Sequence, residues 1–161
     1  MMSLAVAINN VKDNFIPAMI NIFTFSRCYH TELILSDGTA IYCGPKGVKY
    51  IKRDNYDMYS WILIPLNEID AEAEDHIKKE VNRYIEQNAK YDWIGAIFGR
   101  FSSNFNDESK WFCSELCAKL LSPYYPELGI KNVWWSPEKL WKMFGTHTLI
   151  KFVDDPESDH E

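Results

Sequence analysis

Residues 30–51 read HTELILSDGTAIYCGPKGVKYI, and this stretch decides the fold class of the chain. Two turn sequences divide its apolar runs: Asp37 followed by Gly38, and the Gly-Pro-Lys-Gly segment at 44–47. An Asp-Gly step between two alternating apolar runs is a strong signal for a β-hairpin. Together with YSWILIPL at 59–66, the pattern predicts a meander of about four antiparallel strands over residues 28–66. The last of these strands is too apolar for one of its faces to be exposed.

The flanking segments add a strand and several helices to this sheet. The alternating segment SLAVAI predicts a first strand at 3–8, and apolar residues at helical spacing predict an amphipathic helix at 71–88. Ser136 as an N-cap, with Pro137 at the first helical position, predicts another helix over 136–144. The remaining predicted elements are a helix at 14–25, a helix at 112–121, a loop at 122–129 and a closing strand at 146–153.

The order of these elements predicts the architecture. The strands come mostly first and the helices after them, without β–α–β alternation, which is typical of α+β domains. We therefore expect an antiparallel sheet meander packed against helices, in a single domain over residues 1–153. The final residues, 154–161, are largely acidic and are expected to form a disordered tail.

Composition narrows the possible functions. The chain has 161 residues, 47% of them hydrophobic, and a formal net charge of −6. The length and apolar content support a real core, and the negative charge argues against nucleic acid as a partner. No apolar run approaches the roughly 20 residues of a membrane-spanning helix, so we expect no stable membrane insertion. The first residues do not resemble a signal peptide, which favours a cytoplasmic location. Composition predicts no oligomeric state.

The 4 cysteines, at positions 28, 43, 113 and 117, are expected to be free thiols. Disulfides are not needed in an unexported domain of this size. Cys113 and Cys117 are spaced to share one helix face, but no Cys/His pair nearby would complete a zinc site. We therefore expect neither a metal nor an organic cofactor. A redox or zinc protein built on these two cysteines is a weaker alternative.

Cys113 is the candidate nucleophile because it stands at the predicted start of a helix. Unpaired backbone N–H groups and the positive end of the helix dipole favour a thiolate there, and the same N–H groups can hold an oxyanion. Such a cysteine needs a base within hydrogen-bond reach. Among the 4 histidines, His30 opens a predicted strand beside Glu32 and is the best choice. The structural alternative is a small buried cysteine and a solvated histidine.

Three segments, in this order along the chain, carry a resemblance to a known family: CYHTELILSDG at 28–38, AKYDWIGAIFGR at 89–100 and WFCSELCAKLL at 111–121. Together they resemble the circularly permuted NlpC-type papain-like hydrolases, the YiiX/YaeF-like branch, which is related at fold level to lecithin:retinol acyltransferases. In that branch the histidine strand precedes the cysteine helix, as it does here. The H-x-E-L segment with its hairpin is similar to small phage-encoded members, which implies the cytoplasm of a host. The resemblance covers about residues 15–145 and implies a permuted papain-like fold.

The resemblance also implies roles for individual residues. Cys113 would be the nucleophile and His30 the base. Tyr91, in the segment ahead of the nucleophile, would line the oxyanion region, with Ser114 and Tyr29 also lining the site.

The third, orienting group is where the match is weakest. The family's polar or acidic residue would fall near Tyr42 or Cys43, and neither replaces a carboxylate. Glu32 shares a strand face with His30 and is the other candidate, although alternate residues of a strand stand about 7 Å apart. A salt bridge from Glu32 to Arg27 or to a loop lysine is its alternative role.

The implied activity is hydrolysis of, or acyl transfer from, an amide bond in a peptide or peptidoglycan-type substrate. The acyltransferase relation favours a lipid ester instead. A third alternative is a papain-like module that has lost catalysis and binds a host partner, and the weak third group favours it. A Cys113 thiolate that is well populated below neutral pH would support an enzyme, whereas a pKa like that of a free cysteine would support a binding module.

Overall fold

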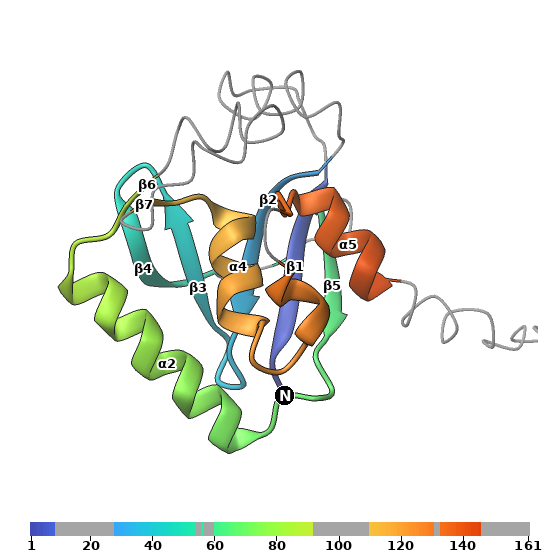
Figure 1. Ribbon diagram of the computed structural model, residues 1–161, viewed down its shortest axis with the longest axis horizontal. Coiled ribbons are helices and arrows are strands. Elements are labelled where there is room, and N and C mark those ends of the chain that lie inside the picture. The colour runs from blue at the N-terminus through green and yellow to red at the C-terminus, as the bar shows by residue number, and fades with distance from the viewer. Residues whose placement is uncertain (9–27, 54–55, 57–59, 92–109, 131–132, 146–161) are drawn as a thin grey trace, which may run out of the picture.

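The computed structural model describes residues 1–8, 28–53, 56, 60–91, 110–130 and 133–145, without the side chains of residues 90–91 and 110–111. This part forms a five-stranded antiparallel sheet with helices packed on one face (Figure 1). The mixed α+β class is as predicted. The predicted helix at 14–25, the closing strand at 146–153 and the acidic tail at 154–161 lie outside the described residues.

The sheet has the strand order β4-β3-β2-β1-β5. Its strands are β1 (Ser3–Ile8), β2 (Cys28–Ile34), β3 (Thr39–Gly44), β4 (Gly47–Lys52) and β5 (Trp61–Pro65). The predicted first strand and the two predicted hairpins are present. β1 lies inside the sheet next to its edge, paired with β2 on one side and with the edge strand β5 on the other.

The prediction for the last strand was wrong in two respects. β5 does not continue the meander, because it pairs with β1 at the edge opposite β4. It is also not covered on both faces, since the side chain of Leu63 is 45% exposed while its neighbour Ile64 is buried. Apolar content did not reveal this exposure. Helices cover only one face of this sheet, so an apolar side chain on the other face can remain exposed.

Two glycines set the hairpins. The Asp37 side chain accepts a hydrogen bond from the Thr39 N–H at 2.8 Å, and Gly38 takes a φ of +83°. The second turn ends at Gly47, whose φ is +88°. A Cβ atom on Gly47 would stand 2.6 Å from the carbonyl oxygen of Ala89, whereas one on Gly38 would meet nothing within 4 Å. Both positions need the left-handed backbone, but only Gly47 also needs the space.

We expect Gly47→Ala to destabilise the protein more than Gly38→Ala. A left-handed alanine costs on the order of 1 kcal/mol at either site, and the clash with Ala89 adds about 1–3 kcal/mol at Gly47 alone. Urea unfolding of both variants measures the difference. Equal losses would show that the approach of this turn to Ala89 contributes nothing to stability.

The helices lie over one face of the sheet. They are α2 (Ala71–Glu86), α4 (Cys113–Leu121) and α5 (Pro137–Gly145), with a short 3₁₀ turn at Pro126–Gly129. α2 and α5 begin where the sequence predicts, and the predicted cap Ser136 accepts a hydrogen bond from the Lys139 N–H at 3.2 Å. Asp70, which the sequence analysis did not single out, caps the N–H of Ala73 at 2.8 Å. α4 packs against β2 and β3, α2 against β4, and α5 against β1 and β2 (Figure 1).

The core fills the space between this face and the helices. Fully buried side chains from the sheet include Leu4, Leu33 and Ile64, and those from the helices include Leu116 and Leu140. Among the described residues, no helix is long and apolar enough to cross a membrane. A two-residue parallel pair, β6 (Lys90–Tyr91) with β7 (Lys110–Trp111), leads directly into α4.

Candidate active site

The sheet opens between β2 and β3. Both strands are described along their whole length, yet their pairing is confined to Leu33 with Ile41 and Ile34 with Ala40, next to the hairpin. Away from the hairpin the two strands separate, and α4 lies over both of them (Figure 1). The backbone edge of β2 from Thr31 backward is therefore not covered by β3.

Strand register places His30 and Glu32 on the face away from the helices. Leu33 pairs with Leu4 and Thr31 with Val6, which are core positions facing the helical layer. Because side chains alternate, Glu32, opposite Ala5, projects to the other side of the sheet, as does His30 one pair further along. The sequence analysis expected His30 to open this strand, but His30 is the third residue of β2.

Cys113 meets His30 at this opening. It is the first residue of α4, and the preceding Phe112 provides no side-chain cap to the helix. The Cys113 thiol is hydrogen-bonded to the His30 imidazole and to the backbone N–H of Thr31. We infer that the separation of β2 from β3 is what allows a helix on one face to reach an imidazole on the other.

Glu32 holds the second nitrogen of His30. The distance from His30 Nε2 to Glu32 Oε1 is 3.1 Å, which leaves Nδ1 for the Cys113 sulfur. Glu32 was one of the candidates for the third group, and its carboxylate does contact His30 despite the strand spacing. Backbone positions two residues apart are separated by about 7 Å, but two long side chains can lean along the strand and meet between them.

The Glu32 carboxylate is saturated with partners. Oε1 accepts from His30 and from the Arg53 guanidinium, and Oε2 accepts from Arg53 Nε and the Tyr56 hydroxyl, both at 2.8 Å. Its side chain is 0% exposed. Glu32 thus contacts His30 and also forms a salt bridge with Arg53. Arg27, which the sequence analysis considered as its ion-pair partner, lies outside the described residues. Nothing in the sequence pointed to Arg53 or Tyr56, which follow 21 and 24 residues later.

These contacts shift the ionisation of all three groups. Burial opposes a charged imidazole, but the Cys113 thiolate and then Glu32 raise the pKa of His30 to about 9. Burial likewise opposes a charged thiol, yet the positive charge and hydrogen bond of His30 lower the pKa of Cys113. Against the effect of burial, the hydrogen bonds from Arg53 and His30 lower the pKa of Glu32 to about 2. The arrangement favours a thiolate–imidazolium pair backed by a carboxylate.

Aromatic rings surround the imidazole. The Tyr42 ring lies 5.2 Å from the His30 ring and the Trp61 ring 6.2 Å from it, centroid to centroid. Cys113 is only 4% exposed, whereas the His30 side chain is 15% exposed. A substrate therefore has more access to the imidazole than to the sulfur in this arrangement.

The other residues that the sequence analysis placed at the site lie in different surroundings. Ser114 is buried and its hydroxyl donates to the Trp135 carbonyl at 2.7 Å, so this hydroxyl joins α4 to the segment before α5. Tyr29 lies at a register shift of β2 against β1, directly before His30, and is half-buried. Cys43 is buried on the core face, where burial raises its thiol pKa. The Tyr91 backbone pairs with Trp111, but its side chain is not described.

The four cysteines are free thiols, as predicted. Cys117, one turn beyond Cys113 on α4, is buried, and burial raises its pKa above that of an ordinary thiol. The two cysteines of this helix therefore differ sharply: one is favoured as a thiolate and the other as a neutral thiol. Within the described residues, no three His, Cys, Asp or Glu side chains group as a metal ion would require.

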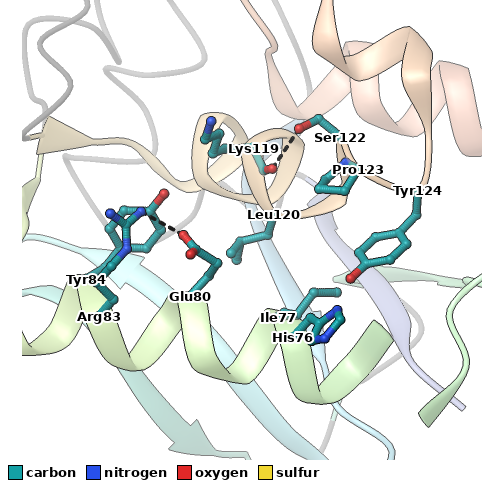
Figure 2. A pocket seen from close by; sticks show the side chains of 10 residues that line it. All are labelled: His76, Ile77, Glu80, Arg83, Tyr84, Lys119, Leu120, Ser122, Pro123 and Tyr124. Atoms are coloured by element: carbon teal, nitrogen blue, oxygen red, sulfur yellow. Dashed lines mark hydrogen bonds and ion pairs between the residues drawn. The ribbon is translucent and has the colours of Figure 1, made fainter. Parts of the chain in front are cut away.

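A recess of about 460 Å³ lies elsewhere, between α2 and the end of α4 (Figure 2). Its walls carry the exposed Arg83–Glu80 ion pair, at 2.7 Å, and the ring of Tyr124. It sits at the C-terminal end of α4, while Cys113 is at the N-terminal end, about 12 Å away for a helix of this length. The recess is therefore separate from the Cys113 site.

Comparison with known proteins finds no matching family model, no matching curated protein and no matching solved structure.

Proposed function

We propose that the protein is a permuted papain-like thiol hydrolase or acyl-transfer enzyme in which Cys113 attacks an amide carbonyl. The observation that carries the proposal is the contact between Cys113, at the uncapped start of α4, and the His30 imidazole, which Glu32 holds from behind. The resemblance of the three sequence segments to NlpC-type hydrolases supports the same assignment. Cytoplasmic action, in a host cell if the protein is phage-encoded, is part of the proposal.

The chemistry follows from these positions. His30 takes the Cys113 proton, and the thiolate attacks the carbonyl carbon to form a tetrahedral oxyanion. Backbone N–H groups at the start of α4 stabilise that oxyanion, with Tyr91 as the proposed additional donor. The imidazolium then protonates the leaving amine as the C–N bond breaks, giving a thioester. Water, activated by His30, or another acceptor releases the acyl group and restores the thiol.

Peptides and peptidoglycan fragments are the proposed amide substrates, with lipid esters as the alternative. The contact between Glu32 and His30 bears on the third possibility, a catalytically inactive binding module. That alternative drew its support from a doubtful third group, and the hydrogen bond between Glu32 and His30 supports Glu32 in the orienting role. A buried, fully coordinated carboxylate behind the imidazole favours an enzyme.

The pH dependence of Cys113 alkylation tests the proposal. We expect iodoacetamide to modify Cys113 with a midpoint well below that of an ordinary thiol, because His30 lowers the pKa of Cys113. In His30→Ala the midpoint should rise to at least the value of a free cysteine. Peptide mapping by mass spectrometry assigns the modified residue, and Cys117 serves as the internal control. A wild-type midpoint like that of a free cysteine would contradict the enzyme and favour a binding module.

A further inference from the structure

The segment between β4 and β5 brings an arginine to the candidate site. β4 and β5 are the two edge strands, so residues 53–60 must connect opposite sides of the sheet. Arg53 and Tyr56, at the beginning and middle of this connection, contact Glu32 on β2, the strand near the middle of the sheet.

We propose, on the basis of the proposed function, that Arg53 and Tyr56 are positioning residues. They hold the Glu32 carboxylate oriented toward His30 and thereby set the pH range over which the Cys113–His30 pair is active. Arg53 fixes both carboxylate oxygens with its planar fork, and Tyr56 adds a donor to Oε2. Neither residue contacts the reacting sulfur. They act through Glu32, which faces Nε2 of His30.

Geometry restricts the alternatives for the carboxylate. A carboxylate has about four lone-pair directions, and here four hydrogen bonds occupy them. Glu32 therefore cannot rotate away from His30 without breaking contacts to Arg53 or Tyr56. Arg53 is itself fixed, because its guanidinium carbon lies 5.0 Å from the Trp61 ring centroid, and Trp61 packs edge-on against His30. Such stacking limits the positions the fork can adopt.

The charges around the imidazole favour the same role for Arg53. The titratable or charged groups around the imidazole come from four elements: Glu32 on β2, Cys113 and Cys117 on α4, Tyr42 and Cys43 on β3, and Arg53 with Tyr56 on the β4–β5 connection. Lys49, on β4, lies 5.2 Å from the Tyr42 ring centroid. Among these groups, Arg53 carries a permanent positive charge and contacts Glu32. It offsets a carboxylate that would otherwise disfavour a second negative charge, the thiolate, nearby.

The test is the pH profile of Cys113 alkylation in Arg53→Met. We expect its midpoint to rise by about one pH unit, because losing the guanidinium leaves the Glu32 charge uncompensated beside the thiolate. Arg53→Lys keeps the charge but loses the fork, so its midpoint should stay close to that of the wild type while the plateau rate falls several-fold. Tyr56→Phe should shift the midpoint upward by about half a unit.

Arg83→Met is the matched control. Arg83 forms an exposed ion pair with Glu80 on α2, and its loss should leave the alkylation midpoint unchanged. A folded Arg53→Met with the wild-type midpoint would overturn the proposal. If that variant does not fold, Arg53→Lys and Tyr56→Phe decide: wild-type profiles in both would overturn it equally. An ordinary thiol midpoint in the wild type would instead count against the proposed function itself.

Discussion

Replacing Cys113 with alanine is expected to abolish covalent labelling of the protein by an acyl-type thiol probe while leaving the fold intact. The substitution removes only the sulfur, and alanine is a strong helix former at the first position of α4. The loss should be nearly complete because His30 lowers the pKa of the Cys113 thiol, whereas burial raises the thiol pKa values of Cys43 and Cys117. Intact-mass spectrometry measures the labelling, and circular dichroism the fold.

Cys117→Ala is the control for this experiment. Cys117 lies one turn further along the same helix and should be dispensable for labelling, since its thiol is held neutral. Labelling that persisted in Cys113→Ala, or that moved to Cys28 or Cys43, would contradict the assignment of Cys113 as the nucleophile.

Glu32→Leu is expected to cause a large loss of stability, about 3–5 kcal/mol, which is typical of removing one partner from a buried ion pair. The substitution leaves Arg53, Tyr56 and His30 without their shared acceptor. Urea unfolding measures the change in the free energy of unfolding. Glu80→Leu is the matched control, because Glu80 pairs with Arg83 at an exposed position and its loss should cost less than about 1 kcal/mol. Equal losses in the two variants would show that Glu32 contributes nothing beyond a surface pair.

The contribution of Glu32 should also depend on pH. Its pKa is lowered from 4.5 to about 2, so the folded state binds the proton less tightly than the unfolded state does. The stability that Glu32 contributes is therefore fully present above about pH 4.5 and is lost as the pH falls toward 2. Glu32→Gln should lack this part of the acid dependence. An acid profile in the variant identical to that of the wild type would contradict the lowered pKa.

Local sequence rules were reliable where a short segment decides its own structure. The hairpins at Gly38 and Gly47 and the cap at Ser136 all involve residues within a few positions of one another. Such features depend on backbone preferences and nearby hydrogen bonds, which a single sequence displays. The placement of Cys113 at a helix start is of the same kind.

The position of β5 in the sheet could not be predicted from local sequence. Its sequence predicts a strand, but its pairing with β1 rather than with β4 depends on which edge of the sheet remained open. Local connectivity favours the nearest strand, and here the β4–β5 connection runs to the far side of the sheet instead. The exposure of Leu63 follows from that edge position.

The sequence by itself determined the α+β class, the turns, the helix starts and the two residues, Cys113 and His30, that chemistry would pair. Only the tertiary structure decided how they meet, because the separation of β2 from β3 lets α4 reach an imidazole on the opposite face. It also decided what stands behind that imidazole. Arg53 and Tyr56 reach Glu32 because the β4–β5 connection joins opposite edges of the sheet, and contacts made by such long-range topology leave no periodic signal along the chain.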